Sequence, residues 1–159
     1  MASRAEWTRY AVPGWGVGEL CTADGLVLAH EFRFGSASHD DTRGVGSSEL
    51  VDRLTAFLAG DDVSLAEVPL DLDWATPFQR AVADALREVQ RGEVASYGEL
   101  AALAGHPGAA RAVGTFCARN RFMFLVPCHR VVGAGGIGGY GSAGVGVKRR
   151  LLELEGVKL

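Results

Sequence analysis

Cys128 is the residue in this sequence best placed to act as a nucleophile. A proline precedes it, and His129 and Arg130 follow it directly. A thiol attacks as its thiolate, which nearby positive charge or a general base favours. A cysteine in an apolar run is more often a small buried hydrophobe, and we interpret Cys21 and Cys117 in that way. The neighbours of Cys128 predict a reactive thiol.

His129 is the candidate general base for this thiol. Neighbouring side chains of an extended chain point to opposite faces, so we expect a water to bridge Cys128 and His129 instead of a direct bond. A carboxylate would orient the imidazole by binding its other nitrogen. Glu155 is a candidate for this role, and Glu153 is equally close in sequence.

The sequence contains no recognisable metal or nucleotide site. His30, His39 and His106 have no ligand spacing with Cys21, and we interpret them as surface or loop histidines. The glycine-rich stretch 133–146 lacks the G-x-x-x-x-G-K-[ST] pattern that binds phosphates. We therefore expect neither a metal nor another cofactor.

Length and composition indicate an ordinary globular protein. The chain has 159 residues, of which 48% are hydrophobic and 22% charged, and three cysteines. It has no apolar run of membrane-spanning length, and its first residues lack the apolar core of a signal peptide. We expect a cytoplasmic protein with reduced thiols and no membrane partner.

The net charge of -3 conceals a division between two parts of the chain. Residues 1–74 hold 5 basic and 13 acidic residues, whereas residues 75–159 hold 11 basic and 6 acidic ones. A basic segment joined to an acidic one is typical of proteins in which the basic segment binds a polyanion such as DNA. We place a domain boundary between residues 74 and 75.

The first part is predicted to contain a sheet and one helix. Residues 16–34 alternate loosely around an Asp24-Gly25 turn signal, which predicts a hairpin. The polar, glycine-rich stretch 35–46 predicts a loop. Ser48 then caps an amphipathic helix that Gly60 ends.

The second part is predicted to be mainly helical. Capping boxes at 76–79 and 96–99 predict helices that run to about residue 91 and over 97–104. A glycine-containing turn leads to a helix over 109–118 with small surface residues, so the pair forms a helix-turn-helix. Residues 122–126 predict a buried strand or extended run, and 147–155 a closing helix. The fold class is therefore α/β (α+β): a small sheet-containing domain, then a mainly helical one.

Several motifs of the second part occur together in one known family. The run Pro127-Cys128-His129-Arg130-Val131 closely resembles the active-site signature of the O6-alkylguanine-DNA alkyltransferases, or methylated-DNA–protein-cysteine methyltransferases. The resemblance covers most of 76–156, roughly half the chain. It also includes these motifs in family order: Phe78-Gln79, Gly92-Glu93-Val94, Ser96-Tyr97-Gly98-Glu99-Leu100-Ala101, Ala110-Arg111-Ala112-Val113-Gly114, Asn120, Lys148, Leu151-Leu152 and Glu155-Gly156.

The resemblance implies direct reversal of DNA damage. The helix-turn-helix would enter the minor groove of double-stranded DNA, and the damaged nucleotide would be flipped into a pocket. Cys128 would take the alkyl group from O6 of guanine as a stable thioether, so each molecule acts once. Residues 1–74 would form an RNase H-like domain. The protein would act as a monomer without a cofactor, at the nucleoid.

The resemblance also implies individual roles. His129 would accept the thiol proton through a water, with Glu155 holding the imidazole. Asn120 would fix the turn that carries the active-site strand, and the Tyr97 hydroxyl would protonate the leaving guanine. DNA contacts are implied for a set that includes the intercalating finger: Arg111, Tyr97, Ser96, Ala109, Ala110, Gly114 and Arg119. Substrate contacts are implied for four residues: Val131, Met123, Tyr140 and Ser142.

Three positions depart from the family pattern. Proline usually follows Asn120, where this chain has Arg121, which predicts a pocket wall of different shape. The aromatic residue of the loop, Tyr140, lies one position nearer to the cysteine than in the family. Ala118 stands where an arginine commonly ends the recognition helix, and Arg119 could substitute for it.

Three other functions are compatible with parts of the pattern. A lesion sensor related to the family would bind alkylated DNA but lack the nucleophile, and the presence of Cys128 argues against it. A helix-turn-helix regulator would bind DNA sequence-selectively without alkyl transfer. A cysteine hydrolase using Cys128 and His129 would turn over repeatedly, but the sequence shows no recognisable third element for such a site.

Overall fold

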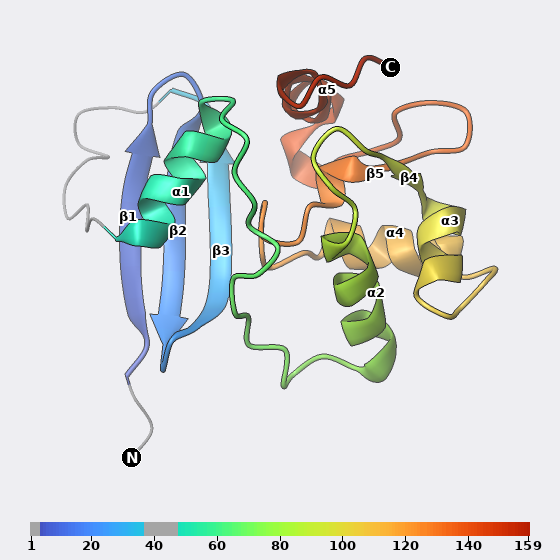
Figure 1. The fold of residues 1–159 in the computed structure, drawn as a ribbon, viewed down its shortest axis with the longest axis horizontal. Helices are drawn as coiled ribbons and strands as arrows, with labels where there is room; N and C mark the ends of the chain where they lie inside the picture. The colour runs from blue at the N-terminus through green and yellow to red at the C-terminus, as the bar shows by residue number, and fades with distance from the viewer. Residues whose placement is uncertain (1–3, 37–47) are drawn as a thin grey trace. The chain divides into compact units, whose positions relative to one another are not determined.

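The computed structural model describes residues 4–36 and 48–159, which form two compact units (Figure 1). The first unit comprises the chain up to Asp71 together with Arg121–Leu125, and the second comprises Leu72–Asn120 and Val126–Leu159. A short later segment, Arg121–Leu125, thus belongs to the first unit. The domain boundary between residues 74 and 75 stays a prediction. Separate roles for the two parts, and the RNase H-like character of the first, stay predictions.

The first unit contains an antiparallel sheet of order β1-β2-β3. Its strands are β1 (Glu6–Val12), β2 (Gly16–Ala23) and β3 (Leu26–Phe34). Asp24 and Gly25 connect β2 and β3 with φ of 53° and 77°, so the predicted hairpin turn is confirmed. The sequence did not predict β1. The predicted loop at 35–46 lies, beyond residue 36, outside the described residues.

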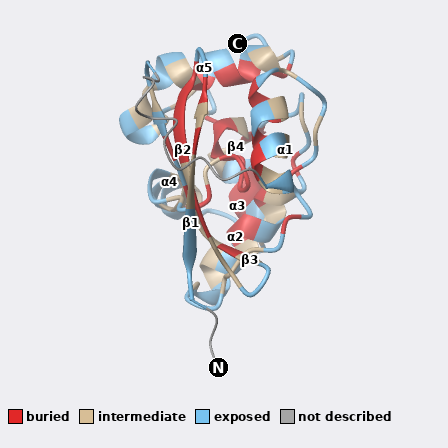
Figure 2. Ribbon diagram, turned by 90° about the vertical axis from the view of Figure 1, so that its left-hand side faces the viewer, coloured by how far each residue is buried: buried red, intermediate tan, exposed pale blue. Residues whose placement is uncertain are grey.

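The helix α1 (Glu49–Leu58) lies across this sheet in Figure 1. Ser48 caps it as predicted, because its hydroxyl accepts a hydrogen bond of 3.1 Å from the Val51 amide. Leu54, Phe57 and Leu58 are buried on one side of the helix, as the sequence spacing requires (Figure 2).

His30 is not the surface histidine that the sequence suggested, because its side chain is 1% exposed. Its Nδ1 lies 2.6 Å from the carbonyl oxygen of Met123 and must donate to it, which leaves Nε2 to accept from the Tyr10 hydroxyl at 2.7 Å. The register of β2 and β3 shifts between Cys21 and Thr22. This bulge reverses the alternation of faces along β3, so that His30 points into the core. His106 is exposed as expected, and His39 lies outside the described residues.

We expect His30 to make the folded chain sensitive to acid. Burial lowers the pKa of His30 to about 4, although the hydrogen bond to Met123 opposes this, whereas the unfolded chain titrates near pH 6.5. As the pH falls below about 6.5 the unfolded chain takes up the proton first. Stability present above that pH is therefore lost progressively towards pH 4, by about 3 kcal/mol.

Urea unfolding at about pH 7.5 and about pH 4.5 measures this loss. In His30→Gln the difference in unfolding free energy between the two pH values should shrink by that amount. The exposed His106→Gln should keep the difference of the original chain. An equal difference in all three proteins would show that His30 is not responsible.

The segment Arg121–Leu125 is built into the first unit. The His30 amide donates to the Arg121 carbonyl at 2.8 Å, and the Met123 amide donates to the His30 carbonyl at 3.0 Å. The Phe124 ring packs among four rings of this unit: His30, Phe32, Phe34 and Phe57. The sequence predicted a buried strand or extended run here. The segment is buried at Phe122, Phe124 and Leu125, but it forms one isolated bridge to β3 instead of a regular strand.

The second unit contains the predicted helix-turn-helix. The helix α2 (Pro77–Arg87) begins in the capping box of Thr76 and Gln79 and ends four residues earlier than expected. The helices α3 (Tyr97–Leu103) and α4 (Ala110–Ala118) pack on each other. Ser96 and Glu99 form the second predicted capping box, at the start of α3.

A short parallel sheet and a final helix complete the second unit. The strand β4 (Ala95–Ser96) pairs with β5 (Val131–Val132), which brings the start of α3 beside the residues that follow Cys128. The helix α5 (Val145–Leu154) begins two residues before the predicted start. The core of this unit is apolar: Val82, Leu86, Leu100, Val113, Val131, Leu151 and Leu152. Among the described residues, no helix is long and apolar enough to cross a membrane.

Candidate active site

Cys128 lies in a tight turn and not in the extended chain that the sequence suggested. Cys128–Arg130 form one turn of 3₁₀ helix, closed by a 2.9 Å hydrogen bond from the Arg130 amide to the Pro127 carbonyl. Three residues complete such a turn, so successive side chains point about 120° apart. The turn therefore directs the thiol, the imidazole and the guanidinium to three different sets of partners.

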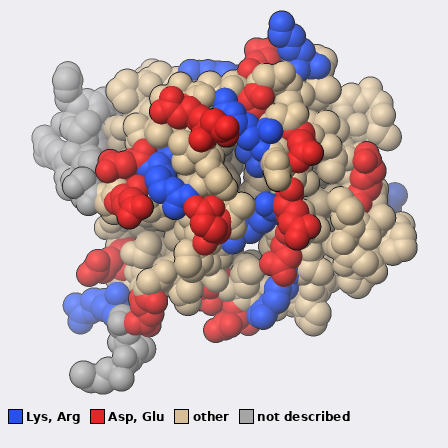
Figure 3. Space-filling view, viewed as in Figure 1, with Lys and Arg blue, Asp and Glu red and all other residues tan. Residues whose placement is uncertain are grey.

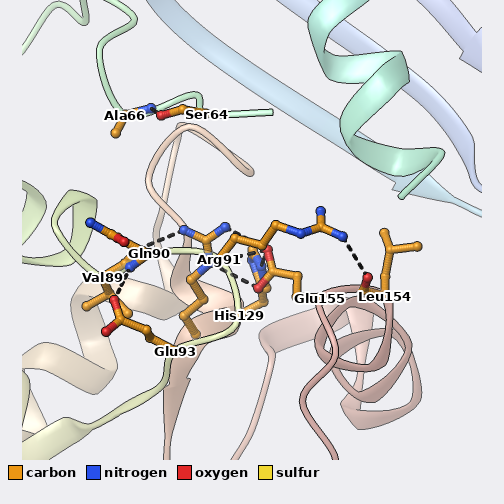
Figure 4. Close-up of polar contacts among 10 residues, drawn as sticks. Ser64, Ala66, Val89, Gln90, Arg91, Glu93, His129, Leu154 and Glu155 are labelled. Carbon is orange, nitrogen blue, oxygen red and sulfur yellow. Dashed lines mark hydrogen bonds and ion pairs between the residues drawn. The ribbon is translucent and has the colours of Figure 1, made fainter. Parts of the chain in front are cut away.

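Glu155 is the carboxylate that holds His129. Its Oε2 lies 3.2 Å from His129 Nε2, and both side chains are fully buried (Figure 4). Glu155 directly follows the last residue of α5 and is buried, whereas Glu153 is exposed. The geometry distinguishes two carboxylates that the sequence left equivalent.

Arg130 binds the same carboxylate through both of its oxygens. Its Nη2 donates to Oε2 of Glu155 at 2.6 Å, and its Nε donates to Oε1 at 3.0 Å. Its Nη1 donates to the Val89 carbonyl at 2.8 Å, just beyond α2. Arg91 fixes the neighbouring carbonyl of Leu154 at 2.9 Å (Figure 4). Arg130 has no separate role in the sequence prediction, because the sequence does not show which carboxylate its guanidinium binds.

The pKa values of this pair favour a neutral imidazole beside a charged carboxylate. Burial alone would raise the pKa of Glu155, but hydrogen bonds from His129 and Arg130 and their positive charge lower it to about 2. Burial lowers the pKa of His129; Glu155 opposes this, while the charges of Arg130 and Lys148 add to it. At neutral pH His129 can therefore accept a proton, and Glu155 stands ready to stabilise the cation that forms.

The thiol of Cys128 is protonated at rest. Burial raises its pKa well above the ordinary value, while the charge of Lys148 and a hydrogen bond with Asn120 oppose the increase. Such a thiol needs a base to become a nucleophile. The hydrogen bonds described for Cys128 and His129 go to different partners. A water that bridges the two side chains stays a prediction.

Lys148 is a second residue whose place in the site was not predicted from the sequence. Its ammonium is buried and donates to the carbonyls of Val131 at 2.5 Å and Gly139 at 2.9 Å. It joins β5 to the glycine-rich loop and brings a positive charge near Cys128. The spacing contains a signal for this, since Lys148 shares one face of α5 with the buried Leu151 and Leu152.

Asn120 and two tyrosines surround the thiol. The Asn120 amide donates to the Val126 carbonyl at 2.9 Å, which ties the end of α4 to the residues before Cys128. The half-buried Tyr97 places its hydroxyl 3.5 Å from the Gly139 carbonyl. Burial and the nearby thiols raise the pKa of Tyr97 and of Tyr140. The charge of a Cys128 thiolate therefore acts on the Tyr140 hydroxyl, despite the shifted position of Tyr140 in the loop.

The other residues expected to contact the substrate lie in different surroundings. The Val131 carbonyl already accepts from Lys148, and the Cys128 carbonyl accepts from the Val131 amide. Each carbonyl has a second lone pair, so both can still accept from a base. Ser142 is exposed in a short turn, Gly141–Ala143, and Met123 belongs to the first unit. Substrate contacts by these residues stay predictions.

The expected DNA-contacting residues lie on α4 and at the start of α3. Arg111 and Arg119 are exposed, whereas Ala109, Ala110 and Gly114 are half-buried. A Cβ added at Gly114 would lie 4.0 Å from the Tyr97 ring, which is ordinary contact. The hydroxyl of Ser96 is used to cap α3. Along residues 4–36 and 48–159, no three His, Cys, Asp or Glu side chains are grouped to hold a metal ion.

Known proteins share this sequence and fold. The sequence profile described as "6-O-methylguanine DNA methyltransferase, DNA binding domain" matches residues 77–157. A methylated-DNA–protein-cysteine methyltransferase of Mycobacterium tuberculosis is 49% identical over 110 residues, which are 68% of this chain and 64% of that protein. One of Methanothermobacter thermautotrophicus is 38% identical over 122 residues, covering 77% of this chain and 68% of that protein.

A solved structure extends the likeness to most of the fold. The structure of Mycobacterium tuberculosis OGT in complex with DNA has a TM-score of 0.78 and 37% identity. It covers 94% of this chain and 92% of that one. The mixed α/β architecture with a small sheet and a helix-turn-helix, predicted from the sequence, is thereby confirmed.

Proposed function

The chain belongs to the 6-O-methylguanine DNA methyltransferase family, and from this premise we propose that it transfers the alkyl group of O6-alkylguanine in duplex DNA to its own Cys128. The observation that carries the proposal is the buried set in which Glu155 holds His129 in the turn that bears the thiol. The product is a thioether that nothing in the site reverses, so each molecule reacts once. The activity is that of a methylated-DNA–protein-cysteine S-methyltransferase.

The reaction begins with a proton transfer. Cys128 gives its proton through a water to the neutral His129, and the Glu155 carboxylate stabilises the imidazolium. The positive charge of Lys148 favours the thiolate that remains.

The thiolate then attacks the alkyl carbon. The new S–C bond forms as the bond from that carbon to O6 breaks, and the electron pair of the broken bond stays with guanine. A proton from the Tyr97 hydroxyl neutralises the departing base. The carbonyls of Cys128 and Val131 accept from its exocyclic amine, and an amide near Ser142 donates to O6.

The proposed DNA face is the exposed side of α4 with the start of α3. The small side chains of α4 allow its backbone to approach the minor groove, and Arg111 fills the gap left by the flipped nucleotide. On the face drawn in Figure 3, basic side chains are interspersed with acidic ones and form no large patch. Acting on chromosomal DNA would place the protein in the cytoplasm, at the nucleoid.

Intact-protein mass spectrometry tests the transfer. We expect the protein mixed with a duplex carrying one O6-methylguanine to gain the mass of one methylene per molecule (CH₃ for H) and then stop. Cys128→Ala should gain nothing, because it removes the only side-chain atom proposed to take up the methyl group. A duplex with guanine at the same position is the matched control.

The other outcomes identify the other functions. Tight, lesion-selective binding without a mass change would favour a sensor. Binding without preference for the lesion would favour a regulator. Release of product in excess of protein would favour a hydrolase.

A further inference from the structure

A pair of aromatic rings joins the turn between α3 and α4 to α2. The ring centroids of His106 and Phe78 lie 5.0 Å apart, and the two rings are inclined at 82°. Aromatic pairs favour this edge-to-face geometry. Phe78 is the second residue of α2 and is half-buried, whereas His106 is exposed. The contact therefore connects the helix-turn-helix to a helix outside it.

The backbone before His106 ends α3 in a defined way. The His106 amide donates to the Ala101 carbonyl at 2.9 Å. The Gly105 amide donates to the Ala102 carbonyl at 3.0 Å, and Gly105 has a φ of 84°. These two bonds, with a glycine in the left-handed region, form a Schellman motif. The motif fixes where the His106 side chain leaves the end of α3.

The backbone after His106 forms a second defined turn. The Ala109 amide donates to the His106 carbonyl at 3.1 Å, across Pro107 and Gly108. Gly108 has a φ of 88°, and proline followed by such a glycine is typical of a type II turn. His106 is therefore the residue that the end of α3 and the turn before α4 share.

The position of α4 depends on this turn. The residue before α4 is Ala109, and no side-chain hydrogen bond caps the helix there, whereas the Ser96 hydroxyl caps α3. Arg111 lies in the first turn of α4. The contact of His106 with Phe78 thus holds the segment that leads directly into the proposed DNA face.

We propose that His106 is a positioning residue for the DNA face and acts through Phe78. With the ring pair in place, the first turn of α4 is fixed before DNA arrives, so less conformational freedom is lost on binding. Without the pair, the turn and Arg111 move more freely, and duplex DNA binds less tightly. This inference rests on the DNA face of the proposed function and adds to it a residue that does not itself contact DNA.

Titration of a fluorescent duplex carrying O6-methylguanine, followed by anisotropy, measures this affinity. All proteins in the titration carry Cys128→Ala, so that no transfer occurs. We expect His106→Ala to raise the dissociation constant about three- to tenfold, the range that an edge-to-face ring pair can supply. His106→Phe keeps the ring pair without the ring nitrogens and should bind like the chain with His106. Weakened binding in both variants would assign His106 a direct contact with DNA and overturn the proposal, as would unchanged binding in His106→Ala.

A double-mutant cycle tests whether His106 acts through Phe78. Phe78→Leu keeps an apolar side chain on α2 but removes the ring. Combined with His106→Ala, it should weaken binding no further than the weaker of the two single variants, because the same contact is already lost. Two residues that act independently would give the product of the two single effects, and that result would also overturn the proposal.

The rate of transfer separates positioning from general damage to the site. In chains that keep Cys128, the single-turnover rate at saturating duplex should fall by less in His106→Ala than the affinity does, because Arg130 and Glu155 hold the site without this turn. A fall as large as the loss of affinity would count against the positioning role. Leu103→Ala removes an exposed side chain three residues before His106 and should change neither quantity.

The same measurements distinguish a failure of this inference from a failure of the proposed function. An original chain that binds the duplex but transfers no methyl group would contradict the proposed function, and the order of affinities among the variants would still decide the role of His106. An original chain that transfers the group, with equal affinities in all variants, would overturn this inference alone. Circular dichroism at the assay temperature verifies that each variant is folded.

Discussion

An Arg130→Met variant is expected to lose about 3–5 kcal/mol of unfolding free energy and most of its rate of alkyl transfer. Arg130 donates three hydrogen bonds to the two oxygens of Glu155, whose side chain is fully buried. Removing one partner of such a pair leaves a buried charge without compensation, which costs more than the pair contributes. The pKa of Glu155 would rise from about 2, and the carboxylate would bind the imidazole less firmly.

Urea unfolding at neutral pH measures the loss of stability, and single-turnover transfer at a temperature where the variant is folded measures the loss of rate. Arg130→Lys keeps the positive charge but loses the planar guanidinium that binds both carboxylate oxygens. Its stability and its transfer rate should lie between those of Arg130→Met and those of the original chain. Arg149→Met removes an exposed arginine that binds the Leu159 carbonyl, and should change stability by less than about 0.5 kcal/mol. A loss below about 1 kcal/mol in Arg130→Met would mean that Glu155 has other sufficient support.

A Phe124→Ala variant is expected to lose a similar amount, about 3–5 kcal/mol. The Phe124 side chain is 3% exposed, and its centroid lies 5.3 Å from that of Phe57 and 5.4 Å from that of Phe32. Truncation leaves a cavity among these rings. The backbone of Phe124 has a φ of 68°, which an L residue adopts at a cost, and alanine does not relieve it.

Phe124→Gly separates the ring from the backbone. Glycine leaves the same cavity but adopts a positive φ without strain, so it should be no less stable than the alanine variant. Thermal and urea unfolding of both variants measure the difference. An alanine variant as stable as the original chain would mean that the surrounding rings close over the cavity.

The sequence predicts best those elements whose signals are local. The capping boxes of Thr76 and Ser96 predicted the starts of α2 and α3, because the interacting groups lie three residues apart. The two-residue strands β4 and β5 are too short to show a period, and their pairing joins residues far apart in the chain. Their absence from the prediction follows from that separation.

The site residues also divide into those predicted by adjacent residues and those whose place depends on distant parts of the chain. The run around Cys128 predicted the candidate thiol and the candidate base, since the elements of that motif are adjacent. Glu155 could not be separated from Glu153 until the end of α5 was known. The inward face of His30 depends on a bulge in a pair of strands, and the single sequence of β3 does not show where a partner strand shifts register.

The place of Arg121–Leu125 in the first unit constrains how the chain can fold during synthesis. The strands β1–β3 and α1 leave the ribosome first, but the ring that fills the space between Phe32 and Phe57 belongs to a segment made only after α2, α3 and α4. Until then the amino-terminal part has an incomplete aromatic core, and such intermediates expose apolar surface. The last step of its folding therefore coincides with the arrival of the residues just ahead of Cys128. A nascent chain stalled before residue 121 should be digested by proteases far faster than one stalled late enough to release Leu125 from the ribosomal tunnel.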